Sequence, residues 1–242
     1  MKYLILFDID GTILRLKKWK SREIFANLFL DFFNCNVPKD ALPSFSGMTD
    51  LLILFEIAEK VGIEKSEILK NIDKIWDKIY NDFIPLSNKQ NIILLTGIKE
   101  FIVKLNEIDN FQLGILTGNF KKNAYLKLKT HSLEHFFPDG AFGDDDPNRN
   151  NLPKIAYKRI INHCNCSDSE FKNIIIIGDS PRDIECAKLS GSISIAVATG
   201  DNTFEDLSRY NPDLIFQDFS DFDYSINKII AFLSSFQSNH II

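Results

Sequence analysis

Residues 2–12 read KYLILFDIDGT, an apolar run that stops abruptly at two aspartates two positions apart. A short apolar run bounded by polar residues is typical of a buried strand, and the Asp-Ile-Asp-Gly sequence that follows is typical of a turn. In open parallel sheets, ligands bind at the carboxyl ends of the strands. We therefore expect Asp8 and Asp10 to stand at the functional edge of a sheet.

Further runs of the same character recur along the chain, and helical patterns separate them. The predicted strands are 111–116, 174–177, 192–197 and 214–216, and the predicted helices are 97–107, 121–129, 154–163 and 183–190. Alternating strands and helices build a parallel sheet with helices on both faces. The sequence therefore predicts an α/β fold with a doubly wound, Rossmann-like core.

One long region departs from this alternation. From about residue 14 to residue 91 there is no convincing strand pattern, and helical patterns occupy 21–33, 49–61 and 65–84. Polar residues at 85–91 mark the return to the main pattern. We expect an α/β core domain formed by 1–14 and 92–242, with an all-α domain inserted at 15–91.

The composition excludes several classes of protein. Of the 242 residues, 45% are hydrophobic and 25% are charged, as in ordinary globular chains. The longest apolar runs are far shorter than the roughly 20 residues of a membrane span, and the first residues lack a secretion signal. A net charge of −5 disfavours nonspecific binding to nucleic acid or anionic lipid.

The four cysteines lack the spacing of a zinc site and suggest free thiols in a reducing compartment. We expect a cytoplasmic monomer or small homo-oligomer without a nucleic-acid or membrane partner.

The residue types at the strand ends indicate the chemistry. Asp8 and Asp10 repel one another unless a cation lies between them, and carboxylate oxygens suit a hard ion such as Mg²⁺. The alternative to a metal-binding role is that Asp8 and Asp10 form a surface turn, but an apolar predicted strand directly precedes them. Asp179 and Asp183 follow a run of four isoleucines and are expected at the same edge.

A polar tripeptide follows another predicted strand. Thr117, Gly118 and Asn119 offer a hydroxyl group and loop amides that can bind phosphate oxygens. A threonine after a strand can instead cap a helix, so the tripeptide alone leaves both roles open.

Taken in order, these motifs resemble a known family. Asp8-x-Asp10-Gly11-Thr12, Thr117 and Gly178-Asp179-x-x-x-Asp183 are similar to motifs I, II and IV of the haloacid dehalogenase-like hydrolase superfamily. The match covers about residues 1–14 and 92–217. The helical insert resembles the cap domain of the subclass that contains phosphoglycolate phosphatase.

The resemblance implies a Mg²⁺-dependent phosphatase acting on a small phosphorylated metabolite. Asp8 would attack phosphorus to form an aspartyl-phosphate, and Asp10 would serve as general acid and base. Thr117, Gly118 and Asn119 would bind the phosphoryl group. The implied metal ligands are Asp8, the backbone carbonyl of Asp10, Asp179 and, in support, Asp183.

Two implied positions stay open. The superfamily's basic motif III is either Lys154, which has a family-like separation from Asp179, or Arg149, which precedes the helix and is favoured as a bidentate phosphate partner. In the cap loop 45–50, Thr49 contributes to substrate binding or is simply the N-cap of the helix that follows.

Other activities of the superfamily fit less well. A dehalogenase needs no acid at position 10, and a phosphonatase would need a lysine within 45–50. A mutase of the β-phosphoglucomutase type should carry an arginine soon after Gly47, where Met48-Thr49-Asp50 stand instead. Phosphatase is the favoured prediction. That mutase and a catalytically silent phosphate-binding module are its alternatives.

Overall fold

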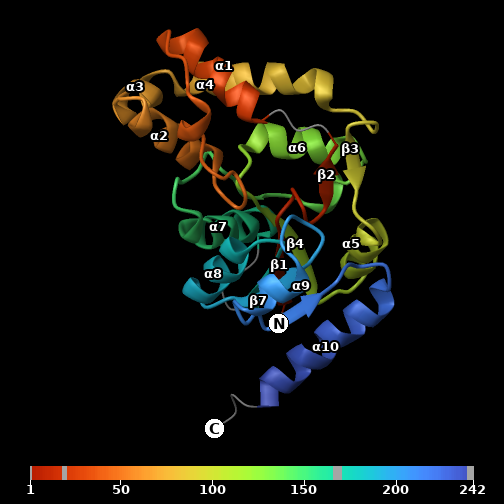
Figure 1. Ribbon diagram of the computed structural model, residues 1–242. Helices are drawn as coiled ribbons and strands as arrows, with labels where there is room; N and C mark the ends of the chain where they lie inside the picture. Colours follow the sequence, from red (N-terminus) through yellow and green to blue (C-terminus); the bar gives the residue numbers. More distant parts are fainter. Residues whose placement is uncertain (1, 18–20, 166–170, 239–242) are drawn as a thin grey trace.

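The centre of the protein is a six-stranded parallel sheet, shown by a computed structural model that describes residues 2–17, 21–165 and 171–238 (Figure 1). The strand order is β5-β4-β1-β6-β7-β8. The bounds are β1 Lys2–Phe7, β4 Phe111–Leu116, β5 Gly140–Ala141, β6 Phe171–Gly178, β7 Ile193–Val197 and β8 Leu214–Phe216. The predicted parallel α/β sheet is confirmed; the two-residue strand β5 was not predicted.

Helices cover both faces of the sheet because residues alternate between faces along each strand. On β1, Ile5 and Phe7 face the cluster that contains residues of α5, α6 and α10, whereas Leu4 and Leu6 face the cluster of α7 and α8. Figure 1 shows α5 and α10 on one side of the sheet and α7 and α8 on the other. The bounds are α5 Ile98–Asn106, α6 Lys121–Lys129, α7 Leu152–Cys164, α8 Pro181–Leu189, α9 Phe204–Ser208 and α10 Phe222–Ser238.

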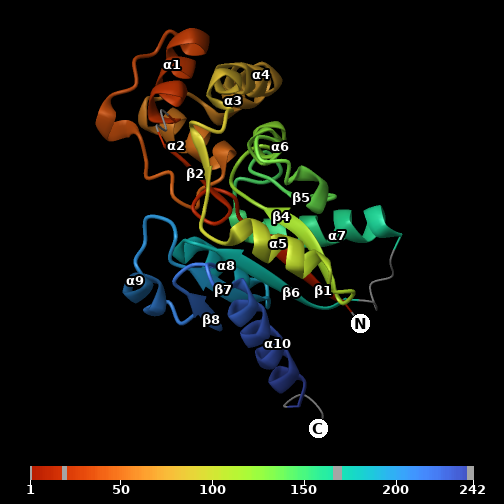
Figure 2. The ribbon, with the colours of Figure 1, turned by 90° about the vertical axis from the view of Figure 1, so that its right-hand side faces the viewer.

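Four helices pack around an apolar cluster of their own, beyond the carboxyl ends of the strands (Figure 2). They are α1 Ser21–Phe33, α2 Asp50–Lys60, α3 Lys65–Lys70 and α4 Ile72–Phe83. The single helix predicted over 65–84 is wrong, because the chain breaks at Asn71 (φ −105°, ψ 6°). Phe120 of the main body joins this cluster by stacking on Trp76, with ring centroids 5.1 Å apart. We call these four helices and the loop 45–50 the cap domain. The division of the chain into domains at residues 15–91 stays a prediction.

A two-stranded antiparallel ribbon lies where the chain passes between the sheet and the cap domain. It pairs β2 (Leu14–Leu16) with β3 (Ile92–Leu94), and Arg15 lies opposite Ile93. The expectation of no strand between residues 14 and 91 is therefore wrong for β2. A three-residue strand is too short to show the period-2 alternation on which sequence prediction relies.

None of the described helices is both long and apolar enough to cross a membrane. Cys35 and Cys186 are free thiols. Cys164 is disulfide-bonded, so the expectation of free thiols is wrong at this residue. The sequence spacing had given no reason to pair it.

Candidate active site

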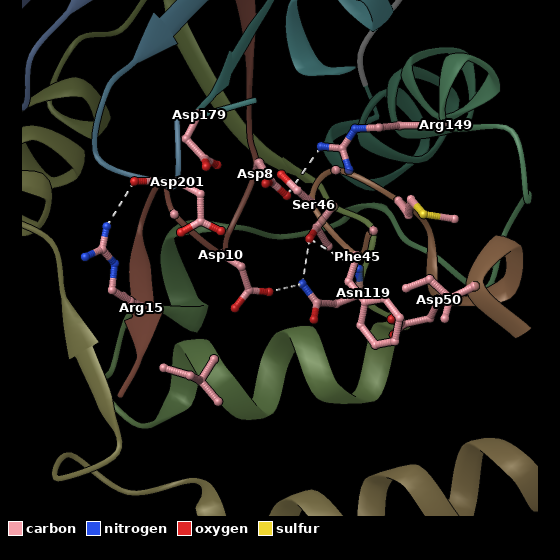
Figure 3. Close-up of a pocket in the computed structure, with 18 of the residues that line it drawn as sticks. Asp8, Asp10, Arg15, Phe45, Ser46, Asp50, Asn119, Arg149, Asp179 and Asp201 are labelled. Atoms are coloured by element: carbon pink, nitrogen blue, oxygen red, sulfur yellow. Dashed lines mark hydrogen bonds and ion pairs between the residues drawn. The ribbon is translucent and has the colours of Figure 1, made fainter. Parts of the chain in front are cut away.

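Three buried aspartates meet at the carboxyl ends of two neighbouring strands, and Figure 3 shows two of them, Asp8 and Asp179. Asp8 follows β1, Asp179 follows β6, and Asp183 lies in the first turn of α8. Because Phe7 pairs with Ile177 in the sheet, the residues after these strands emerge side by side. One carboxylate oxygen from each aspartate lies within 4.8 Å of the others.

The electrostatics of this acidic cluster call for a cation. Burial raises the pKa of Asp8 to about 6, opposed by the nearby charge of Arg149. Burial, together with the charges of Asp8 and Asp183, also raises the pKa of Asp179 well above its ordinary value. Ionised carboxylates at such distances are costly unless a positive charge compensates them. Their oxygens are the ligands that hard divalent cations prefer, so the donor set fits a metal ion such as Mg²⁺.

The turn after β1 fits closely against Asp179. Gly11 has φ +87°, and a Cβ atom at this residue would collide with the Asp179 carboxylate. The buried Thr12 hydroxyl donates a hydrogen bond to Asp179 Oδ1 over 3.1 Å. The Asp-x-Asp-Gly-Thr sequence therefore both presents Asp8 and orients an acid from a strand far along the chain.

Asp10 lies beside the acidic cluster and is held by two polar side chains. Its Oδ2 accepts hydrogen bonds from Asn119 Nδ2 over 2.7 Å and from Lys127 Nζ over 2.5 Å. Lys127 also donates to Asn119 Oδ1 over 2.6 Å. Asp10 lines the cavity, and its Oδ1 has no hydrogen-bond partner among the described residues.

Lys127 was missed by the sequence analysis. In a helix that also carries Lys121, Lys122 and Lys129, a further lysine resembles part of a solvated face. The available signal was its position, four residues after the buried Asn123 and three after the buried Ala124, which places it on the inward face.

Thr117 lies at the end of β4 and is fully buried. Its Oγ1 accepts hydrogen bonds from the Asn119 backbone amide over 3.3 Å and from Asn119 Nδ2 over 2.8 Å. Within the described part of the chain, no group accepts the Thr117 hydroxyl proton. This proton is available to an oxygen atom in the cavity.

The structure separates the two candidates for the basic position. Arg149 is 6% exposed and forms ion pairs with Asp183 and, over 3.4 Å, with Asp8. Its Nε is buried and has no hydrogen-bond partner among the described residues. Lys154 is exposed on α7 and does not line the cavity. Of the two, Arg149 is the one beside Asp8.

These groups open into a cavity of about 350 Å³ between the sheet and the cap domain. Side chains from both parts line it. From the cap domain come Phe25, Phe45, Ser46, Gly47, Met48, Asp50 and Ile53; from the main body come Asp8, Asp10, Gly11, Arg15, Leu16, Thr117, Gly118, Asn119, Arg149, Asp179, Gly200 and Asp201. A cavity of this volume, polar on one side and largely apolar on the other, suits a small organic molecule with a charged end.

The cap domain contacts the loops after β4 and β5 through backbone groups. The Asp50 amide donates to Gly118 O over 2.7 Å, and the Leu51 amide donates to Gly143 O over 3.2 Å. In return, the Phe120 amide donates to Asp50 Oδ2 over 2.9 Å. Burial raises the pKa of Asp50 to about 7, and the Phe120 amide opposes this shift.

Thr49 has the capping role that the sequence analysis gave as an alternative. It is the N-cap of α2, accepting from the Leu52 amide over 3.2 Å. Its hydroxyl donates to Pro147 O over 2.9 Å, and the side chain does not line the cavity. The structure therefore supports the capping role of Thr49 and not a substrate contact.

Proteins of known name resemble this chain over most of its length. A phosphoglycolate phosphatase of Vibrio parahaemolyticus is 25% identical over 214 residues, which cover 88% of this chain and 90% of the relative. A pyrophosphatase of Bacillus velezensis is 24% identical, with 90% of this chain and 93% of the relative covered.

Solved structures share the fold. A β-phosphoglucomutase of Clostridium difficile has a TM-score of 0.69 and 18% identity, covering 97% of this chain and all of the other. A hydrolase of Pseudomonas syringae has a TM-score of 0.64 and 21% identity, covering 95% and 99%. The family model of haloacid dehalogenase-like hydrolases matches residues 5–197. The resemblance seen in the sequence motifs is thereby confirmed, and the chain belongs to the haloacid dehalogenase-like hydrolase family.

Proposed function

We propose that the protein is a Mg²⁺-dependent phosphatase that hydrolyses a small organic phosphate monoester through a phosphorylated Asp8. The observation that carries the proposal is the grouping of Asp8, Arg149 and Thr117 around one cavity, directly beside Asp179. Full-length relatives that are named phosphatases support it. The volume of the cavity supports a small substrate.

In the first step, an Asp8 carboxylate oxygen attacks phosphorus, and the bond from phosphorus to the ester oxygen breaks. The leaving oxygen takes the electron pair of that bond and a proton from Asp10. Arg149 and the Thr117 hydroxyl stabilise charge on the phosphoryl oxygens. Arg149 suits this role because it lines the cavity and lies 3.4 Å from an Asp8 carboxylate oxygen.

In the second step, Asp10 removes a proton from water, and the water oxygen attacks phosphorus. The bond from phosphorus to Asp8 then breaks, which releases inorganic phosphate and restores the Asp8 carboxylate. Asn119 and Lys127 hold Asp10 by one oxygen throughout, which leaves Oδ1 to exchange the proton.

Asp8, Asp179 and the backbone carbonyl of Asp10 would hold the Mg²⁺ ion. When bound, the ion supplies positive charge that offsets the repulsion between the attacking carboxylate and the phosphate. Asp183 has both oxygens engaged, one by Arg149 and the other by the amide and hydroxyl of Ser180. It therefore supports the metal by positioning its neighbours.

The test is release of inorganic phosphate from a panel of small phosphate esters, with Mg²⁺ and with chelator. Wild-type protein should release phosphate only with Mg²⁺. Acid-quenched samples should carry a phosphoryl group on the peptide that contains Asp8, and Asp8→Asn should lack both signals while keeping the wild-type circular dichroism spectrum. Phosphorylated Asp8 with transfer to a second sugar hydroxyl instead of water would favour the phosphomutase alternative. Appreciable turnover by Asp8→Asn would refute the nucleophile assignment.

A further inference from the structure

The described residues that line the cavity include two arginines, and only one of them is neutralised by carboxylates. Arg149 forms ion pairs within the acidic cluster. Arg15 forms no ion pair with any described residue; its Nη2 donates to Thr199 O over 2.5 Å and to Gly200 O over 3.1 Å. Figure 3 shows the two arginines on opposite sides of the cavity. Arg15 is therefore a positive charge in the cavity wall that forms no ion pair with a carboxylate of the described residues.

The fold holds this guanidinium in place from both ends. Its backbone is fixed in the ribbon, where Arg15 pairs with Ile93 and the adjacent Leu14 is fully buried. Its tip is fixed on the loop after β7, which is itself attached to the turn after β1 because the Thr199 hydroxyl donates to Gly11 O over 2.6 Å. Restraint at both ends reduces the entropy lost when such a side chain binds a ligand.

The anchoring leaves most of the donors unused. A guanidinium has five N–H groups in a planar fork, and both Nη2 hydrogens of Arg15 are directed at carbonyl oxygens. Nη1 and Nε have no hydrogen-bond partner among the described residues. Parallel N–H donors of this kind bind a carboxylate or phosphate in a bidentate manner.

We propose that Arg15 is a specificity-determining residue that binds a second anionic group of the substrate. The substrate would then be a small phosphate monoester that also carries a carboxylate or a second phosphate. This inference rests on the phosphatase function proposed above. It goes beyond that function because it states what lies at the other end of the substrate.

The rest of the cavity wall supports this position for the second anion. The cap domain contributes mainly apolar side chains and no cation, and the carboxylate of Asp50 would repel an anion placed beside it. Arg149 is already engaged by two carboxylates and lies next to the attacking group. Only the position beside Arg15 compensates the charge of a second anion in the described cavity.

The experiment compares three esters built on the same two-carbon frame. Phosphoglycolate carries a carboxylate, ethylene glycol bisphosphate carries a second phosphate, and the reference, 2-hydroxyethyl phosphate, carries an uncharged hydroxyl group in place of the second anion. The quantity measured is the ratio of kcat/KM for each anionic ester to kcat/KM for the reference. For wild type we expect a ratio of at least about 10 for one anionic ester, and that ester identifies the second group.

Arg15→Gln should lower this ratio at least tenfold, mainly through KM, and Arg15→Lys should lower it less because it keeps the charge but loses the fork. The matched control is Arg209→Gln. Arg209 is an exposed arginine outside the cavity that pairs with Asp206, and its loss should leave the ratio at the wild-type value.

The outcomes separate the two proposals. Wild-type ratios near one for both anionic esters, or a ratio that Arg15→Gln does not change, would overturn the role of Arg15 and leave the phosphatase function standing. Equal losses of kcat/KM for all three esters would also overturn it, because Arg15 would then only anchor the loop after β7. No phosphate release from any ester by wild type with Mg²⁺ would overturn the phosphatase function and this inference with it.

Discussion

Lys127 Nζ lies 2.5 Å from Asp10 Oδ2, although the lysine side chain is 1% exposed and the aspartate side chain is 41% exposed. The lysine has lost its hydration and the aspartate has kept part of it. An ion pair with this asymmetry contributes little net stability, because the desolvation of the lysine offsets the attraction. Its effect is to fix the position of Asp10 Oδ2 at the edge of the cavity.

Lys127→Met should therefore reduce activity more than stability. We expect kcat to fall at least tenfold and KM to change less than about threefold, because Lys127 does not line the cavity. The protein should still fold, since an apolar side chain of similar length replaces a buried charge. Steady-state kinetics and thermal melting measure both effects. Lys122→Met, at an exposed position of the same helix, is the control; an unchanged kcat for Lys127→Met would contradict the positioning role.

Arg149→Ala should reduce activity far more than Lys154→Ala. Removing Arg149 leaves the buried carboxylates of Asp8 and Asp183 without their cation. Losing one partner of a buried ion pair costs about 3 to 5 kcal/mol, and losing a donor to the transferring group lowers kcat by about 10² or more. Lys154→Ala changes an exposed side chain and should alter stability by no more than about 0.5 kcal/mol. The reverse ranking in kcat/KM would assign the basic position to Lys154.

Magnesium should raise the melting temperature of the wild-type protein without any substrate. At about 100 times the dissociation constant, a ligand stabilises the folded state by about 2.7 kcal/mol. Asp179→Asn should abolish this shift. With chelator, the same variant should melt no lower than wild type, because it removes one of the buried charges that repel each other. The control is the exposed Asp77→Asn; an equal magnesium shift in Asp179→Asn would argue against this metal site.

The raised pKa of Asp50 predicts a pH dependence of stability. Its pKa is about 7 in the folded state against an ordinary 3.8, so the unfolded chain releases this proton first as pH rises. Folded-state stability from this residue is therefore present at low pH and is lost as pH rises through about 7. Asp50→Asn keeps an oxygen that can accept the Phe120 amide and removes the titration.

The free energy of unfolding of Asp50→Asn relative to wild type should therefore increase between pH 5 and pH 8. One pKa unit corresponds to about 1.4 kcal/mol, and we expect a change of at least that size. Denaturant titrations at several pH values measure it. The exposed Asp109→Asn should show no such trend, and a pH-independent difference for Asp50→Asn would contradict the shift.

Much of the main fold could be predicted because local patterns and burial agree there. The predicted bounds of β1, β4, α1 and α6 coincide with those observed. In each of these elements the apolar residues lie on the side that packs on a core, so the sequence pattern reports the packing directly.

The elements that were missed lack such a local signal. β2 and β3 have three residues each, which is less than two periods of alternation. The break between α3 and α4 occurs at Asn71, without a glycine or proline to interrupt the helical pattern. Tertiary contacts accompany these boundaries: β2 and β3 pair with each other and pack on the main core, whereas α3 and α4 pack within the cap domain. The local sequence pattern does not contain those contacts.

The candidate site likewise contains residues that could be predicted from the sequence and residues that could not. Asp8, Asp179 and Asp183 could be expected to meet because strands of a parallel sheet end at one edge. Lys127 and Arg15 could not, because their importance depends on partners distant in sequence: Asp10 for the first, and the backbone of Thr199 and Gly200 for the second.

The backbone contacts between the cap domain and the loops after β4 and β5 leave no space for a side chain at two glycines. A Cβ atom at Gly118 would collide with Met48 O, and one at Gly143 would collide with Gly118 O. An alanine at either residue would push loop 45–50 away from Thr117, and bulk solvent could then enter the cavity. In the proposed reaction, the absence of a side chain at Gly118 and Gly143 would therefore help to keep bulk solvent away from the phosphoryl group.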